Sequence, residues 1–305
     1  MSTEYIHFTA AQKEAARQTD LVALLQSQGE YLKRSGKEYV WRDGSEKVTV
    51  RGNLWFHQYE RIGGDAVDFV RRFYNMDFPQ AVNFLLGNNG GALPQAEPVK
   101  REPPKPFTLP PKNDNMRRVY AYLLNRRGID REVLSAFVHK GMIYESADYH
   151  NAVFVGYDEH GIARHAHKRG TGSESTYKGN AESCDPRYSF HWTGTDNTLY
   201  LFEAPIDMLS FISLHKENWR SHSYAAACCV GDQVLFQMLK ANPNIDTVCL
   251  CMDNDAAGQA ANKRISDKLF IQGIKHEILV PEFKDWNEDL LCDEQEETEC
   301  QTLQL

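Results

Sequence analysis

The last third of the chain alternates short apolar runs with helix-like stretches, and this alternation constrains the fold more than any other feature of the sequence. Between residues 198 and 291 the apolar runs are "TLYLFE", "SYAAACC", "DTVCLCMD" and "KHEILV". The stretches that follow the first three runs, at 205–215, 232–240 and 257–270, have the length of helices. Strands that alternate with helices are typical of βαβ units, in which neighbouring strands run parallel. We therefore expect a mainly parallel α/β sheet in this part of the chain.

Acidic residues stand where three of these strands end. Glu203 closes the first run with Asp207 one helical turn later, Asp253 closes the third run with Asp255 two residues on, and the fourth run leads to Asp285. Ligands bind at the carboxyl ends of the strands in an open parallel sheet, so we expect these side chains to converge. Such a set of carboxylate oxygens suits Mg²⁺ or Mn²⁺. A single Asp-x-Asp is common in ordinary loops, but acids at three strand ends favour a metal site.

The segments "LYLFEAPIDMLSF", "CLCMDNDAAGQAANKRI" and "KDWNEDL" together resemble the Toprim domain. DnaG-type primases share this domain with type IA and II topoisomerases and some nucleases. Its signature is a glutamate after one strand, Asp-x-Asp after another and a further acid near the end, and "DNDAAGQAA" is most similar to the primase branch. The resemblance covers residues 198–291 and implies a Rossmann-like catalytic domain. It implies catalytic roles for Glu203, Asp253 and Asp255, and metal-binding roles for Glu203, Asp207, Asp253, Asp255 and Asp285.

The last motif departs from the primase pattern at one position. Primases commonly carry two acids one residue apart there, whereas "KDWNE" has Asp285 followed by Asn287. An amide oxygen can bind a cation but adds no charge, so either the second ion is held more weakly or Glu288 replaces Asn287. Glu203 also has two interpretations, as a metal ligand or as a general base.

The N-terminal module, residues 1–87, combines a helix-like start at 10–27 with the short β-like pieces "EYVWR", "KVTVR" and "NLWFHQ". Two helices follow, with Asp65 and Asp77 near their starts. The segment "GGDAVDFVRRFYNMDFPQAVNFLL" resembles the C-terminal part of the zinc-binding domain of DnaG-type primases. The module has no cysteine, and His57 is the histidine of its ribbon-like region, so it lacks the four ligands that a structural zinc site needs. We expect a zinc-ribbon-like α+β module that binds no zinc.

Three further segments complete the predicted organisation. Residues 88–111 contain seven of the twelve prolines and are expected to be an extended linker. The resemblance implies that residues 112–197 are a middle α/β segment of the primase-like core, and their pattern predicts a helical start, a break at "RRGID" and then mostly β structure. Residues 292–305 read as an acidic, solvated tail.

The middle segment carries two basic clusters. Arg126 and Arg127 lie on or beside a helix, while Lys168, Arg169 and Lys178 surround a predicted hairpin. Such side chains suit the phosphates of a template strand or of an incoming nucleotide. Arginines on a helix are more often a solvated face, so the hairpin cluster is the stronger candidate.

The strand within "GIARHAHKRG" also places two histidines together. Alternation puts His165 and His167 on one face and Arg164, Ala166 and Lys168 on the other. A metal pair would need a third ligand, for which the sequence offers no candidate. We therefore favour a structural role for the histidines.

The charge and cysteine content permit a nucleic-acid partner and favour the cytoplasm. The formal net charge is −8, but residues 281–305 hold nine acids and one lysine, so residues 1–280 are formally neutral. The seven cysteines form no Cys-x-x-Cys pair, as expected of a reduced, cytosolic protein. No apolar run approaches the length of a membrane span, so we expect no membrane partner.

The leading hypothesis from the resemblance is a Mg²⁺- or Mn²⁺-dependent DNA primase-like nucleotidyltransferase. The resemblance implies single-stranded DNA and nucleoside triphosphates as substrates. It also implies a helicase or relaxase as partner and a role in replication or transfer of a plasmid or other mobile element. A Toprim nuclease is the second candidate, although the chain lacks the P-loop motif of the ATPase domain that usually accompanies one. A non-catalytic module that binds or recruits nucleic acid is the third.

Overall fold

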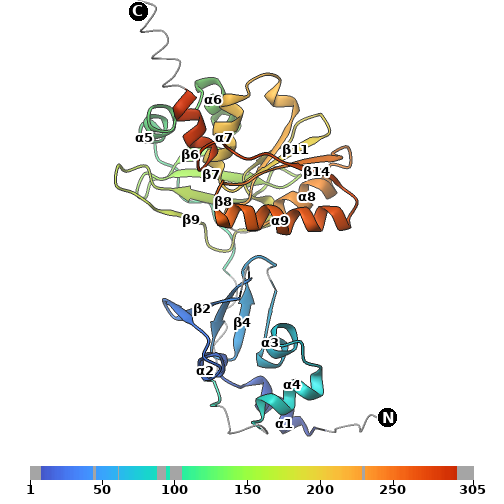
Figure 1. Cartoon of the computed structure of the whole chain (residues 1–305). Coiled ribbons are helices and arrows are strands. Elements are labelled where there is room, and N and C mark those ends of the chain that lie inside the picture. Colours follow the sequence, from blue (N-terminus) through green and yellow to red (C-terminus); the bar gives the residue numbers. More distant parts are fainter. Residues whose placement is uncertain are drawn as a thin grey trace, which may run out of the picture. The chain divides into compact units, whose positions relative to one another are not determined.

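A computed structural model describes residues 8–43, 46–60, 62–87, 94–96, 105–228 and 231–293 (Figure 1). The chain divides into two compact units, residues 1–103 and 104–305. The predicted proline-rich linker spans this boundary, and most of it lies outside the described residues, as does the predicted acidic tail beyond residue 293. No helix in the described ranges combines the length and the apolar character that crossing a membrane requires.

The N-terminal unit combines an antiparallel sheet with α-helices, as the sequence predicts. The strands lie side by side in chain order: β1 (Leu32–Ser35), β2 (Glu38–Asp43), β3 (Glu46–Arg51), β4 (Leu54–His57) and β5 (Gly63–Gly64). The helices are α1 (Ala10–Arg17), α2 (Leu21–Ser27), α3 (Ala66–Phe73) and α4 (Phe78–Leu85). The relation of this unit to a zinc ribbon stays a prediction.

Aspartate side chains fix where three of these helices begin. Asp65 and Asp77 are the N-caps of α3 and α4, and each belongs to a capping box. The single helix expected over 10–27 is instead two helices. Asp20 interrupts it, because its carboxylate accepts a hydrogen bond of 2.9 Å from the backbone N–H of Ala23 and so starts α2.

Aromatic side chains from the sheet and α3 build the core of this unit. Trp41 and Trp55 each pack edge-on against Phe73 with ring centroids 5.2 Å apart, and Phe69 is fully buried between them. Each large apolar side chain buried in this way stabilises the fold by about 1.5–3 kcal/mol.

The C-terminal unit contains the mainly parallel sheet expected from the sequence. Its strand order is β10 (His191–Trp192), β12 (Ser223–Ala226), β11 (Thr198–Phe202), β13 (Thr247–Cys251) and β14 (Lys275–Ile278). All neighbouring pairs are parallel except β10 with β12. The connecting helices are α7 (Pro205–Leu214), α8 (Gln233–Ala241) and α9 (Ala256–Ile271), and residues 286–293 are also helical.

A second, antiparallel sheet precedes the parallel one in the chain, and confirms the β-rich middle segment. Its strands, in spatial order, are β6 (Ile143–Glu145), β7 (Ala152–Tyr157), β8 (Ala163–Arg169) and β9 (Lys178–Asn180). The helical elements of this middle segment are α5 (Arg117–Tyr120), the π-helix η1 (Ala121–Arg126), α6 (Arg131–His139) and the 3₁₀ turn η2 (Pro186–Tyr188). A further 3₁₀ turn, η3 (Trp219–Ser221), lies between α7 and β12. The chain turns between η1 and α6, where Gly128 has a φ of 66°, so the predicted break at "RRGID" is present.

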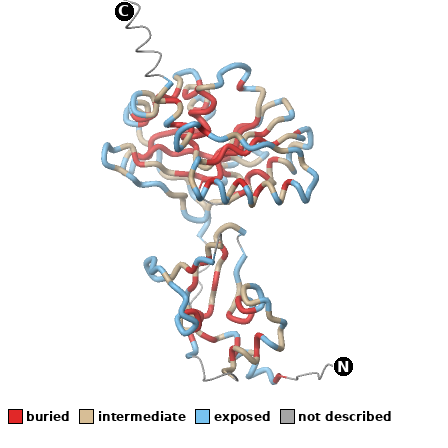
Figure 2. The backbone as a smooth tube through the Cα atoms, in the orientation of Figure 1, coloured by how far each residue is buried: buried red, intermediate tan, exposed pale blue. Residues whose placement is uncertain are grey.

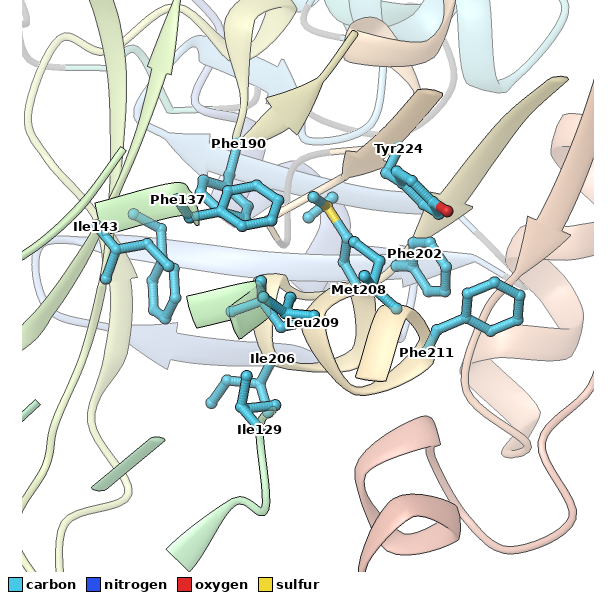
Figure 3. Close-up of a cluster of buried hydrophobic side chains, with 14 of the residues drawn as sticks. Ile129, Phe137, Ile143, Phe190, Phe202, Ile206, Met208, Leu209, Phe211 and Tyr224 are labelled. Atoms are coloured by element: carbon cyan, nitrogen blue, oxygen red, sulfur yellow. The ribbon is translucent and has the colours of Figure 1, made fainter. Parts of the chain in front are cut away.

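The two sheets share one hydrophobic core. Phe137 and Phe190 from the middle segment pack with ring centroids 5.3 Å apart, and they belong to the same buried cluster as Phe202 and Leu209 (Figure 3). Buried residues accordingly follow the strands of both sheets (Figure 2). The middle segment therefore packs directly on the parallel sheet, which fixes β8 and β9 relative to the ends of β11 and β13.

Candidate functional site

A pocket of about 170 Å³ opens where the carboxyl ends of β11 and β13 meet strands β8 and β9. Its lining combines four carboxylates and four cations with an imidazole, an amide and a few apolar groups. The acidic residues are Glu203, Asp207, Asp253 and Asp285. The basic residues are Arg127, Arg169, Lys178 and Lys284. The sequence placed the acids at strand ends, and the structure brings these four together.

Strand register and two hydrogen bonds explain this convergence. Phe202 of β11 lies opposite Cys251 of β13, so the residues that follow them leave the sheet at the same edge. The indole N–H of Trp286 donates to the carbonyl oxygen of Cys251 at 3.0 Å, and the N–H of Asn254 donates to the carbonyl oxygen of Lys284 at 2.8 Å. These bonds tie the loop after β14 to the end of β13 and hold Asp285 beside Asp253.

Burial and mutual repulsion raise the pKa values of the pocket carboxyl groups. Burial is the largest cause for Asp253, whose pKa rises to about 7, and the neighbouring Glu203, Asp285 and Asp255 add to it. Asp207 is 7% exposed on the first turn of α7, and burial followed by the charge of Asp253 holds its pKa well above the usual range. Burial also raises the pKa of Glu203. The ionised groups therefore destabilise one another unless a positive charge joins them.

The chemistry of this donor set fits a hard divalent cation. Asp253 Oδ1 is buried and has no hydrogen-bond partner in the part of the chain that the structure describes. A buried carboxylate oxygen without a donor is costly, and a cation would satisfy it. Because the four acidic side chains provide carboxylate oxygens as ligands, Mg²⁺ or Mn²⁺ fits this site better than a metal that prefers nitrogen or sulfur.

Two of the predicted ligands also cap helices. Asp255 Oδ1 accepts hydrogen bonds of 2.9 Å from the N–H groups of Ala257 and Gly258 at the start of α9. Asp285 Oδ1 accepts from the N–H groups of Asn287 and Glu288 at 3.1 and 2.9 Å. Asp255 does not line the pocket, although its charge raises the pKa values of Glu203 and Asp253.

Strand alternation divides the predicted basic residues into two groups. Arg169 and Lys178 line the pocket together with Arg127. Lys168 points to the other face of β8, where its Nζ lies 5.7 Å from the centre of the Tyr177 ring. Arg126 is exposed and donates to the carbonyl oxygen of Gly172 at 3.0 Å, away from the pocket lining.

The sequence did not point to Lys284, and it favoured a structural role for His167 rather than a place in the pocket. Lys284 directly precedes Asp285 in "KDWNE", and its charge lowers the pKa of Glu203. His167 shares a strand face with Arg169, which alternation could have shown. Burial first, and then the charges of Lys178 and Arg169, lower the pKa of His167 to about 4, so the ring is neutral at physiological pH. Among the described residues, no third ligand atom joins His165 and His167 in a metal-binding group.

Asn287, the departure from the primase pattern, is engaged within the protein. Its side chain is 3% exposed, and its Oδ1 accepts from Arg127 Nη1 at 2.9 Å. Its Nδ2 donates to the Arg127 carbonyl oxygen at 2.7 Å and to Ser210 Oγ at 3.0 Å. Glu288, the alternative ligand, is exposed and accepts from the N–H of Lys284 at 3.2 Å.

The N-terminal unit holds a compact group of metal-ligand atoms, from Glu46, His57 and Glu60, all within 4.8 Å of one another. His57 Nδ1 accepts from the N–H of Glu60 at 3.0 Å, so the neutral ring carries its proton on Nε2, which contacts the Glu46 carboxylate. The carboxylate of Glu60 pairs with Arg72 at 2.8 Å. Contacts within the protein therefore account for the position of each group.

In a comparison with known proteins, two protein families match successive parts of the C-terminal unit. Residues 200–290 match a family described as Toprim-like, and residues 121–196 match a family described as "Protein of unknown function (DUF3991)". The uncharacterized protein pXO2-78 of Bacillus anthracis is 25% identical over 274 residues, which cover 85% of this chain and 79% of that protein.

Two solved primase structures are also similar. The Aquifex aeolicus primase, with its zinc-binding and RNA polymerase domains, matches with 16% identity and a TM-score of 0.41 over 96% of this chain and 84% of that one. The primase fragment of the bacteriophage T7 primase-helicase protein matches with 20% identity and a TM-score of 0.46 over 67% of this chain and 83% of that one. The parallel strand order, the acids at the strand ends and the family match coincide, and residues 200–290 are therefore a Toprim-like domain.

Proposed function

We propose that the protein is a primase-like nucleotidyltransferase that depends on Mg²⁺ or Mn²⁺ and makes short primers on single-stranded DNA. The observation that carries the proposal is the pocket of the Toprim-like domain, where four carboxylates face four cations and the buried Asp253 Oδ1 has no donor among the described residues. Carboxylates suit a divalent cation, and cations suit the phosphates of a nucleotide or a template.

In the proposed reaction, the 3′-hydroxyl oxygen of a primer forms a bond to the α-phosphorus of a nucleoside triphosphate. The bond to pyrophosphate breaks, and the hydroxyl proton passes to a base. Glu203 is our candidate for that base, because burial raises the pKa of its carboxyl group and so increases its affinity for a proton.

The remaining acids, Asp207, Asp253, Asp255 and Asp285, would hold the divalent ions. When bound, such ions increase the acidity of the attacking hydroxyl and neutralise charge on the leaving pyrophosphate. On the opposite side, Arg169, Lys178 and Arg127 would orient the phosphates by charge-assisted hydrogen bonds.

The biological setting is part of the same proposal. The template would be single-stranded DNA and the substrates nucleoside triphosphates, with a replicative helicase or a relaxase as partner in the replication or transfer of a mobile element. These points rest on the sequence resemblance to primase-like Toprim proteins.

The test is a primer-synthesis assay with single-stranded DNA, labelled ribonucleotides or deoxyribonucleotides, and Mg²⁺ or Mn²⁺. It compares the wild type with Asp253→Asn and with Asp267→Asn, a matched change at an exposed aspartate on α9. We expect short products from the wild type and Asp267→Asn and none from Asp253→Asn. Degradation of the template that also requires Asp253 would replace the proposal with a nuclease. Equal products from all three proteins would remove the metal site from the reaction.

A further inference from the structure

Arg127 is held by two parts of the C-terminal unit at once. It follows the π-helix η1, within the segment that matches the family of unknown function, whereas Asn287 belongs to the Toprim-like domain. Asn287 contacts both the guanidinium and the main chain of Arg127, at 2.9 and 2.7 Å. The Asn287 side chain therefore fixes the position of the Arg127 guanidinium in the pocket.

A single hydroxyl joins this arginine to a second one. The hydroxyl oxygen of Tyr122 accepts from Arg127 Nε at 3.0 Å and from Arg169 Nε at 3.3 Å. Tyr122 is 3% exposed and lies near the start of η1, so the surrounding core holds its side chain in place. With each Nε bound to it, the two guanidinium groups keep further N–H donors on their Nη atoms.

These cations form no ion pair with any acidic side chain of the described residues. Within the described ranges, no carboxylate oxygen lies within 4.0 Å of a side-chain nitrogen of Arg127, Arg169 or Lys178. They nevertheless line the same pocket as four carboxylates. A group of cations kept apart from nearby acids favours an anionic ligand, and two planar guanidinium groups suit the tetrahedral oxygens of phosphate.

We infer that Asn287 is a positioning residue for Arg127 and not a metal ligand. Arg127 then acts with Arg169 and Lys178, the phosphate-orienting cations of the proposed function, which form a phosphate-binding wall within the 121–196 segment. This inference rests on the proposed function for the identity of the ligand, a nucleoside triphosphate. It gives the segment of unknown function a role, which is to complete the Toprim-like pocket with its phosphate-binding side.

The hydrogen bonds also explain why an amide stands at position 287. The Arg127 carbonyl oxygen needs a donor, and the Arg127 guanidinium needs an acceptor. An asparagine offers both from one side chain, whereas an aspartate would place a second carboxylate oxygen against the Arg127 carbonyl oxygen. The asparagine at position 287, which departs from the acidic residue common in primases, therefore suits a residue that holds an arginine in place.

The experiment measures binding of inorganic tripolyphosphate and, separately, of Mn²⁺ to the full chain by calorimetry. The variants are Arg127→Ala, Asn287→Ala and the double variant, with Arg131→Ala as control because Arg131 is exposed and outside the pocket lining. We expect Arg127→Ala to weaken tripolyphosphate binding about tenfold. Asn287→Ala should weaken it about fivefold, because the arginine must then be ordered on binding. The double variant should be no weaker than Arg127→Ala, since Asn287 acts through the arginine.

The affinity and stoichiometry for Mn²⁺ should stay unchanged in Asn287→Ala. Asn287→Asp, which keeps the size of the side chain, covers the case in which the alanine variant does not fold; it should weaken tripolyphosphate binding without raising the number of Mn²⁺ ions bound per chain. Loss of Mn²⁺ in Asn287→Ala, an added Mn²⁺ in Asn287→Asp, or additive effects in the double variant would overturn the inference. Tripolyphosphate binding as expected, together with a failed primer-synthesis assay, would remove the proposed function and leave the phosphate-binding wall.

Discussion

Gly258 lies so close to Asp253 that a Cβ atom on the glycine would come within 2.0 Å of the aspartate carbonyl oxygen. Helix α9 therefore begins directly against the end of β13, as the small residues in "DNDAAGQAA" indicate. The contact lies between the segment that follows β13, which carries Asp253, and the helix that Asp255 caps. Any side chain at position 258 must displace one of them.

Gly258→Ala should therefore disturb the acidic pocket without adding or removing charge. We expect weaker Mn²⁺ binding by about tenfold and a lower free energy of unfolding by about 1–3 kcal/mol, the usual cost of overpacking. Calorimetric titration with Mn²⁺ and urea unfolding check this. Gly172→Ala is the control, since a Cβ there meets its nearest atom at an ordinary 3.7 Å. Equal behaviour of the two variants would show that the close approach is not needed.

Removal of divalent metal should destabilise the wild type but not Asp253→Asn. Burial and mutual repulsion raise the pKa of Asp253 to about 7, so without metal its carboxyl group is only partly ionised at neutral pH. A cation that binds the ionised carboxylates stabilises the fold, by about 2.7 kcal/mol at a hundred times its Kd. Asp253→Asn removes the ionisable group and replaces one of its two carboxylate oxygens with an amide nitrogen. Thermal unfolding of both proteins in EDTA and in excess Mg²⁺ measures the difference. A Mg²⁺-dependent rise in Tm that persists in Asp253→Asn would count against a metal at this position.

Acid should destabilise the fold through His167. Burial lowers the pKa of His167 to about 4, below its ordinary value of 6.5, so the folded protein binds fewer protons than the unfolded chain between these values. The stability that depends on the neutral ring is present above about pH 6.5 and is lost as the pH falls towards 4, in total on the order of 3 kcal/mol.

His167→Asn removes this titration and keeps a donor near the position of Nδ1, which donates to Asn180 Oδ1 at 2.7 Å. Urea unfolding of both proteins from pH 7.5 to 4.5 should therefore give a steeper fall for the wild type. Parallel curves would assign the acid sensitivity to other groups.

Arg169 and Lys168 are adjacent in sequence and lie on opposite faces of β8, so their removal should have different effects. We expect Arg169→Ala to weaken tripolyphosphate binding about tenfold, because it removes a charge-assisted donor from the pocket. Lys168→Ala should change the affinity less than about twofold, since its charge sits on the far face and is screened by solvent. Calorimetry at one fixed salt concentration makes the comparison. Equal losses would mean that net charge, and not position in the pocket, controls binding.

The sequence was sufficient to predict the parallel sheet and the meeting of Glu203, Asp207, Asp253 and Asp285. Regular alternation of strands and helices determines which strand ends share an edge, so local patterns carry that information. The capping role of Asp255 was less visible, because a helix start and a metal ligand favour the same residue type. The contacts of Asn287 could not be predicted, since its partner Arg127 is 160 positions away in the chain.

The parallel sheet is not built from the Toprim-like segment alone. Strand β10 belongs to the residues that match the family of unknown function, yet it pairs with β12, and Phe137 and Phe190 cover the same core as Phe202. A protein fragment that began at residue 198 would lack the edge strand β10 and would expose aromatic side chains of the core to water. Recombination during evolution, or the construction of chimeric proteins in the laboratory, would therefore have to transfer both segments together.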